Sequence, residues 1–222
     1  MSAWRRSHDL TVVLLAFASG ATDVLSFLAL LGTFTSAMTG NTALLGLALG
    51  QGRIQAAERS FTAFVGFVVG VVIGMLPPDR GDVRPDLVRI LGLEAICLLM
   101  FTGIWMIRPS DTQSSVIYVL ILFSAAGMGL QSVAARRMNL PGIPTVVFTS
   151  TLTNIVAAGA DTLLGRGPFP FSAKRQLAVF AAYVVGTLFA GVLATHNLEV
   201  LILLPLGAVL AALFNEITAP TT

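Results

Sequence analysis

Residues 33–50 read TFTSAMTGNTALLGLALG, and this stretch decides the topology of the chain. It is apolar overall but is interrupted by hydroxyl residues, by Gly40 and by the amide of Asn41. A second stretch of the same kind, GIPTVVFTSTLTNIVAAGADTLL, occupies residues 142–164. A helix needs about 20 mostly apolar residues to cross a hydrocarbon core of about 30 Å, so both stretches are borderline. Whether they cross the bilayer determines the number of spans.

Six other segments are long and apolar enough to be membrane-spanning helices. They are residues 10–31, 61–76, 87–107, 115–135, 177–194 and 198–214. Of the 222 residues, 55% are apolar and 11% charged, against about 45–50% and about 25% in an average soluble domain. Because so few charges cannot cover a soluble surface, the chain is predicted to be an all-α integral membrane protein. The first segment outruns a signal-peptide core and is expected to be a retained span.

The 13 Lys and Arg residues lie singly or in pairs between apolar runs, a pattern that excludes a basic nucleic-acid-binding face. They act instead as topology signals, because cytoplasmic loops collect Lys and Arg. With eight spans and a cytoplasmic N-terminus, eight of the 13 lie inside. If residues 33–50 and 142–164 enter and leave on one side, ten lie inside and three outside. We therefore expect six spans plus two broken or re-entrant segments, with eight spans as the alternative.

The two halves of the chain resemble each other, which predicts a single membrane domain over residues 1–222 with repeat halves at about 10–107 and 115–214. The informative matches pair Gly20 with Gly129, Gly32 with Gly142, Thr35 with Thr145, Thr39 with Thr149, Arg59 with Arg175, Gly70 with Gly186, and Glu94 with Glu199. With six spans each half crosses the membrane three times, so the second copy is inverted. With eight spans the repeat is parallel. Both arrangements occur in secondary transporters.

Asp23 lies about the middle of the first predicted span. A carboxylate at that depth costs on the order of 2.5–3.5 kcal/mol unless it is protonated, paired or in contact with water. Ionisable groups there are functional candidates by default. The alternative is that Asp23 caps a half-helix that begins after a break at Ala18-Ser19-Gly20, by accepting amide hydrogen bonds. Both roles are compatible.

The hydroxyl-rich runs can serve either close helix packing or contact with a solute. Small residues are favoured wherever membrane helices touch. Exposed backbone at membrane depth is allowed only where it lines a cavity or is buried in protein. The repeat and the two asparagines, Asn41 and Asn154, favour a site. The candidate solute- or ion-contacting residues are Asp23, Thr39, Gly40, Asn41, Gln131, Thr149, Thr151 and Asn154. Gln131 serves equally well as a hydrogen bond between helices.

Glu94 is a second acidic residue within a span, about two turns inside the segment that begins at Leu87. Interfacial snorkelling or a pair with an arginine of another helix is favoured for it. A proton relay through Asp23 and Glu94 is the alternative.

Other residues are expected to be structural. Gly66, Gly70 and Gly74 form a small-residue stripe that favours internal packing over a dimer face, although homo-oligomerisation fits it too. Arg136 and Arg137 are expected to anchor the cytoplasmic end of a span, with an anion-binding role as the alternative.

The chain lacks the groups that an enzyme needs. It has one cysteine, Cys97, and two histidines, His8 and His196, near span ends. No H-E-x-x-H motif occurs, and Ser or Thr hydroxyls without a neighbouring base are poor nucleophiles. We expect no catalytic residue, metal site or cofactor.

Several of these residues resemble those of the YoaK-type family of bacterial multi-pass membrane proteins. The resemblance rests on Gly20 to Asp23 followed by Met38-Thr39-Gly40-Asn41, and on Gly129-Leu130-Gln131 followed by the threonine-rich run from Thr149. This sequence has Thr149-Ser150-Thr151 where family members commonly show Thr-Gly-Thr. The resemblance implies a location in the bacterial inner membrane and suggests transport, without naming a substrate.

The sequence thus favours a secondary transporter or permease for a small solute or ion, with a midplane site between two repeats and Asp23 as its proton or cation site. A channel is a close variant, distinguished by flux that does not saturate. The alternative is a structural or regulatory partner of another membrane protein, which small-residue packing faces also support.

Overall fold

The computed structural model describes residues 3–76, 83–107, 115–138, 148–196 and 198–219. All regular secondary structure in these ranges is helical, so the predicted all-α class is confirmed. The described helices are α1 (Ala3–Ala29), α2 (Met38–Gly50), α3 (Ile54–Met75), α4 (Val83–Ile107), α5 (Val116–Arg137), α6 (Phe148–Leu163), α7 (Phe171–His196) and α8 (Leu198–Thr218).

Six of these helices are long and apolar enough to cross a membrane: α1, α3, α4, α5, α7 and α8. Each overlaps one of the six segments predicted from the sequence, and α3, α4 and α7 begin four to seven residues earlier than predicted. The helices α2 and α6 have 13 and 16 residues. At about 1.5 Å per residue they extend about 20 and about 24 Å, less than a hydrocarbon core of about 30 Å.

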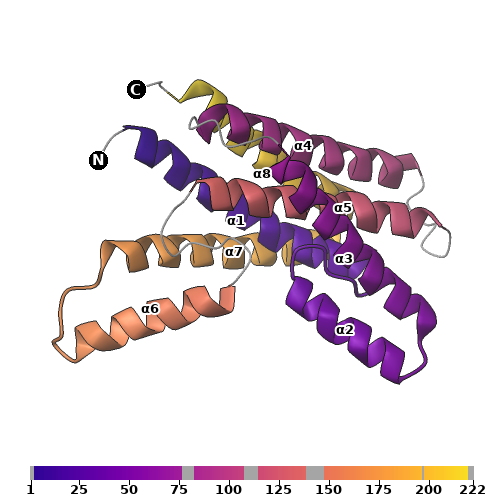
Figure 1. The fold of residues 1–222 in the computed structure, drawn as a ribbon, viewed down its shortest axis with the longest axis horizontal. Helices are drawn as coiled ribbons and strands as arrows, with labels where there is room; N and C mark the ends of the chain where they lie inside the picture. Colours follow the sequence, from indigo (N-terminus) through magenta and orange to yellow (C-terminus); the bar gives the residue numbers. More distant parts are fainter. Residues whose placement is uncertain (1–2, 77–82, 108–114, 139–147, 197, 220–222) are drawn as a thin grey trace.

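The two short helices have a distinctive path. Each begins near the middle of the molecule and runs outward, α2 and α6 toward opposite ends (Figure 1). Each then turns back into a long helix that it packs against, α2 into α3 and α6 into α7. This path agrees with the prediction of two broken or re-entrant segments.

The same helix contacts occur in both halves of the chain. The contact between α1 and α7 corresponds to the contact between α5 and α3. The contact between α1 and α8 corresponds to the contact between α5 and α4. At both major crossings the backbones touch through glycines, where an added Cβ would lie 2.1–2.3 Å from a backbone carbonyl oxygen of the other helix. These glycines are Gly20 and Gly186 between α1 and α7, and Gly129 and Gly70 between α5 and α3. Gly20 and Gly70 are the sequence counterparts of Gly129 and Gly186, so the same contact is built twice.

The expected break at Ala18-Ser19-Gly20 is wrong, because α1 is continuous from Ala3 to Ala29. Gly20 serves the crossing with α7 instead, since a side chain there would collide with the Tyr183 backbone. The helical hydrogen bonds of α1 do not need to be interrupted for this purpose.

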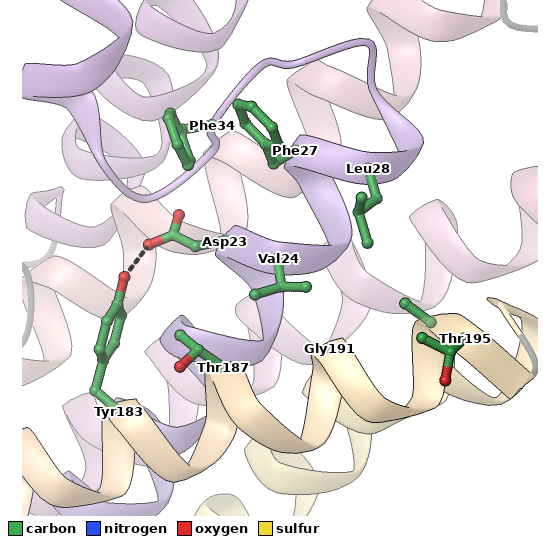
Figure 2. Close-up of a pocket in the computed structure, with 10 residues that line it drawn as sticks. Asp23, Val24, Phe27, Leu28, Phe34, Tyr183, Thr187, Gly191 and Thr195 are labelled. Carbon is green, nitrogen blue, oxygen red and sulfur yellow. Dashed lines mark hydrogen bonds between the residues drawn. The ribbon is translucent and has the colours of Figure 1, made fainter.

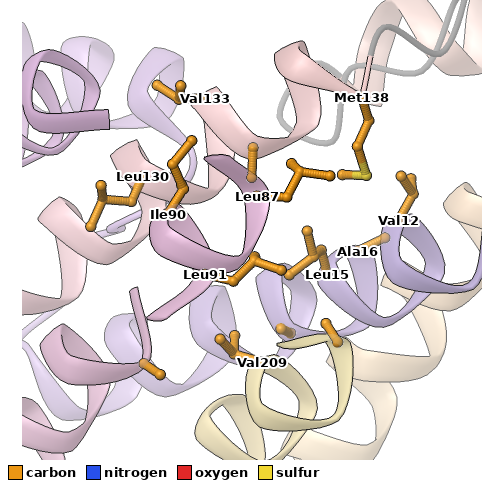
Figure 3. Close-up of a cluster of buried hydrophobic side chains, with 14 of the residues drawn as sticks. Val12, Leu15, Ala16, Leu87, Ile90, Leu91, Leu130, Val133, Met138 and Val209 are labelled. Atoms are coloured by element: carbon orange, nitrogen blue, oxygen red, sulfur yellow. The ribbon is translucent and has the colours of Figure 1, made fainter. Parts of the chain in front are cut away.

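The centre of the bundle is formed by α1 and α5. In an apolar 18-residue stretch of each helix, 67% of the residues are buried in α1 and 61% in α5, against 17% in α7. Most of the large apolar side chains of α7 face outward. Figure 3 shows one core cluster, in which Leu15 of α1, Leu91 of α4 and Val209 of α8 meet. The glycine stripe Gly66, Gly70 and Gly74 packs against α5, so it is internal.

Charged side chains hold the helix ends together. Arg137 at the end of α5 pairs with Asp86 in the first turn of α4, while its neighbour Arg136 is exposed. Arg175 of α7 pairs with Asp9 of α1. Each pair ties the end of one helix to that of a neighbour; the predicted role of Arg136 and Arg137 as anchors at the cytoplasmic end stays a prediction.

Candidate functional site

The break between α1 and α2 creates the candidate site. Leu31 and Gly32 adopt positive φ angles of 53° and 77°, and the amide of Gly32 donates to the Phe27 carbonyl at 2.9 Å. The following residues up to Ala37 are not helical. This non-helical segment lies within the bundle, where each of its backbone polar groups needs a partner.

Asn41 supplies part of that partnership. Its side-chain oxygen accepts a hydrogen bond from the Phe34 amide at 3.1 Å, and its side-chain nitrogen donates to the Phe34 carbonyl. Thr35 fixes the same segment to α5 through a 2.8 Å hydrogen bond with Ser124. Asn41 therefore stabilises the break between α1 and α2 by pairing backbone groups that no helix satisfies.

Asp23 faces this segment from α1 and is 4% exposed. One carboxylate oxygen, Oδ2, accepts hydrogen bonds from Ser36 at 2.7 Å and from the Tyr183 hydroxyl of α7 at 2.9 Å. Ser19 in turn donates to Ser36 at 3.1 Å. The other oxygen, Oδ1, is buried and accepts no hydrogen bond from the described residues. The structure thus brings α1, α7 and the entry to α2 together around one acidic group.

A groove of about 710 Å³ opens beside this group, between α1 and α7. Figure 2 shows Asp23 hydrogen-bonded to Tyr183 at one end of the groove, with the Phe34 and Phe27 rings close by. The residues that line it are Asp23, Val24, Phe27, Leu28, Phe34, Tyr183, Thr187, Gly191, Ala194 and Thr195. The hydroxyls of Thr187 and Thr195 donate to carbonyls of their own helix. The groove is therefore an apolar recess with a carboxyl group at one end.

The structure does not gather the other predicted site residues into this groove. Thr39 is exposed, and Gly40 packs against the Phe34 ring. On α6, Thr149 and Asn154 are exposed while Thr151 is buried. None of these residues lines the groove.

Gln131 is buried and donates to the Leu15 carbonyl of α1 at 2.9 Å. This contact matches the alternative given from the sequence, a hydrogen bond between helices. Its side-chain oxygen is buried and has no hydrogen-bond partner among the described residues.

Glu94 lies in the middle of α4 and is 0% exposed, so it does not snorkel to an interface. Neither carboxylate oxygen has a hydrogen-bond partner in the described part of the chain, which also leaves the expected arginine pair unobserved. The sequence placed Glu94 near the membrane surface because α4 was expected to begin at Leu87, whereas it begins at Val83.

Tyr183 and Ser36 were not singled out from the sequence as site residues. Tyr183 is one of two tyrosines, and the repeat pairs it with Phe67, so a phenol stands where the other half has a phenyl ring. In the same register Asp23 is paired with Ser132. The sequence signal that could have identified Tyr183 was therefore a position at which one repeat has a polar side chain and the other does not.

A metal centre is not indicated by the described residues, which contain no cluster of three or more His, Cys, Asp or Glu side chains suited to hold an ion. Asp23 and Glu94 lie on separate helices with different neighbours, and each offers a single carboxyl group. The chemistry available at the groove is charge pairing and proton exchange at a carboxyl group.

Comparison with known proteins gives family matches without an activity. A family model described as "Protein of unknown function (DUF1275)" matches residues 11–215. The chain is also similar to the UPF0700 transmembrane protein YoaK of Bacillus subtilis (strain 168), with 34% identity over 146 residues. That alignment covers 64% of this chain and 63% of the relative, so it spans under two thirds of the relative's length. No solved structure matches the chain significantly.

Proposed function

The chain belongs to the DUF1275 family, which is described as one of unknown function, and we propose that it is a secondary transporter. It moves a small solute or ion across the bacterial inner membrane through the groove between α1 and α7. The observation that carries the proposal is the Asp23 carboxyl group, which lines this groove and has one oxygen without a partner among the described residues. Acidic groups at membrane depth are costly and typically mark ion or substrate pathways.

The arrangement of the repeats supports the same function. Secondary transporters commonly bind their cargo where discontinuous helices meet near the midplane, and they alternate access by rocking one repeat against the other. Here the non-helical entry to α2 supplies Ser36 to Asp23, and α7 of the other repeat supplies Tyr183. A movement of α7 relative to α1 would therefore change the surroundings of the Asp23 carboxyl group.

Proton coupling is part of the proposal. Asp23 is the group that exchanges a proton for the cargo, and Glu94 is a second carboxyl group in the bundle interior that can take up a proton. A buried carboxyl group without a charged partner has to be neutral or reach water. This requirement applies to Glu94, which makes no hydrogen bond with the described residues.

The proposed orientation has a cytoplasmic N-terminus. With α2 and α6 re-entrant, ten of the 13 basic residues fall on the side of the N-terminus, as the positive-inside rule requires of the cytoplasmic face. No catalytic role is proposed, since His8 is engaged with Glu216 at 2.9 Å and lies far along α1 from Asp23.

The test is proton flux in liposomes that contain the purified protein and a pH-sensitive dye. Pools of metabolites and ions are screened with and without a proton gradient. We expect a solute-dependent proton flux for wild type that saturates with solute and is lost in Asp23→Asn. Flux that does not saturate would indicate a channel.

Asp161→Asn is the matched control, because it makes the same chemical change at an exposed carboxylate that pairs with Arg166 on the surface. It should retain the wild-type flux. If wild type, Asp23→Asn and Asp161→Asn are all folded and all silent across the pools, proton-coupled transport is contradicted, and uncoupled transport gains support. The alternative of a structural partner protein then gains support.

A further inference from the structure

The groove between α1 and α7 has a composition that selects among solutes. Its one acidic group is Asp23, and no basic residue is among those that line it. Three aromatic rings stand in its wall, from Phe27, Phe34 and Tyr183, and the first two lie 5.0 Å apart between ring centroids. Aromatic faces attract cations, and a carboxylate pairs with them. The charge of the complementary ligand is therefore positive.

The rest of the wall excludes strongly hydrated solutes. Its other side chains are apolar, and the hydroxyls of Thr187 and Thr195 are engaged with carbonyls of α7. A polar solute such as a sugar would lose its hydration without regaining hydrogen bonds, which is unfavourable. A ligand with an apolar body loses nothing by entering, and a volume of about 710 Å³ is in the range of drug-sized ligand sites.

The groove also opens on the outer surface of the bundle, beside exposed apolar side chains. Phe27 and Leu28 on its rim are 45% and 53% exposed, within a helix long enough to span the membrane. A ligand dissolved in the bilayer can reach such a groove laterally. This favours a cation that partitions into lipid over one confined to water.

We infer that the groove binds a lipophilic organic cation, with the positive centre beside the Asp23 carboxyl group and the apolar body against Phe27 and Phe34. The inference rests on the proposed function, because it names the substrate class of the same site. Such a cation could be a free small molecule or the ammonium headgroup of a lipid. A free cation fits the recess beside Asp23 better than a lipid headgroup does, because its charge lies close to its apolar body.

The test is equilibrium dialysis of radiolabelled tetraphenylphosphonium against the purified full-length protein in detergent. Binding is compared with that of tetraphenylborate, which has nearly the same shape and the opposite charge. We expect saturable binding of tetraphenylphosphonium alone, weakened at least about tenfold in Asp23→Asn because the attraction between the phosphonium and the carboxylate is lost, and unchanged in Asp161→Asn. Phosphatidylethanolamine added to the micelles should not displace it.

Equal binding of both ions, or full binding by a folded Asp23→Asn variant, would overturn the inference. Displacement by phosphatidylethanolamine would contradict the assignment to a free cation and would assign the site to a lipid headgroup. The assay needs no transport, so its failure is distinct from that of the proposed function. If tetraphenylphosphonium binds but no solute drives proton flux in liposomes, the cation site is supported and the proposed transport is contradicted. If a solute drives proton flux but tetraphenylphosphonium does not bind, transport is supported and this substrate class is contradicted.

Discussion

Asp23 and Glu94 both lie deep in spanning helices, but their surroundings differ. Asp23 receives two hydrogen bonds from neighbouring segments and lines a groove, whereas Glu94 is enclosed and has no partner among the described residues. The sequence identified both residues by the cost of burying an acid. It could not assign their surroundings, because Ser36 and Tyr183 lie 13 and 160 residues from Asp23.

Glu94→Gln should leave the thermal stability of the protein in detergent close to that of wild type. The side chain that is replaced makes no hydrogen bond to the described residues and packs near Gly127 and Cys97, so a neutral group of the same shape costs little. In liposomes the same variant should lose proton-coupled flux if Glu94 takes up a proton. The measurements are a melting curve and the dye assay.

Glu216→Gln is the contrasting variant, because Glu216 is equally buried but accepts hydrogen bonds from His8 and Thr11. It should lower the free energy of unfolding by about 1–3 kcal/mol, because an amide oxygen in place of the carboxylate is a weaker acceptor for the two hydrogen bonds from His8 and Thr11. A loss of stability in Glu94→Gln as large as that in Glu216→Gln would show that Glu94 has a stabilising partner.

At the scale of helices, hydropathy placed all six long helices, because a span must be continuously apolar over its length. The hydroxyl-rich runs were correctly separated from them, and α2 and α6 begin at Met38 and Phe148, which are counterparts in the repeat. The error concerned Gly20, which was given the role of a helix break. A glycine that breaks a helix and one that admits another helix look the same in a sequence, and only the position of α7 distinguishes them.

Gly70→Ala should destabilise the protein, because the added Cβ would lie 2.1 Å from the Ala126 carbonyl oxygen and force α3 away from α5. Overpacking of this kind costs about 1–3 kcal/mol. The measurement is the melting temperature in detergent.

Gly92→Ala on α4 is the matched control, since an added Cβ there has nothing within 4 Å. It should be neutral or slightly stabilising, as alanine favours helix by about 1 kcal/mol over glycine in soluble helices. Equal melting temperatures for the two variants would mean that α3 and α5 can separate at no cost.

In the whole molecule, the helix packing repeats in both halves, whereas the acidic groove occurs once, between α1 and α7. The crossings of α1 with α7 and of α5 with α3 use equivalent glycines, but Asp23 has Ser132 as its counterpart and Tyr183 has Phe67. The repeat therefore supplies a symmetric framework. The polar site comes from positions where the two halves differ, Asp23 in the first half and Tyr183 in the second. Under the proposed function, a rocking motion between equivalent halves would act on one binding position.

The six-span topology predicts that the turns after α2 and α6 lie on opposite sides of the membrane. Single cysteines at exposed positions, Gln51→Cys and Leu164→Cys in a Cys97→Ala background, can be labelled in vesicles with a membrane-impermeant maleimide. We expect only Leu164→Cys to react in inside-out vesicles and only Gln51→Cys in right-side-out vesicles. Labelling of both positions from the same side would require eight spans, and reaction of both after solubilisation is the control.

The sequence by itself determined the membrane class, the six long helices and the two interrupted segments, because each depends on composition within one short stretch of chain. It also indicated the repeat, which is a comparison of the chain with itself. Only the tertiary structure decided that Asn41 holds the backbone of Phe34, that Glu94 is enclosed, and that Tyr183 and Ser36 meet Asp23 at a groove. These outcomes depend on which helices approach one another and at what rotation, and that is fixed by packing between residues far apart in the chain.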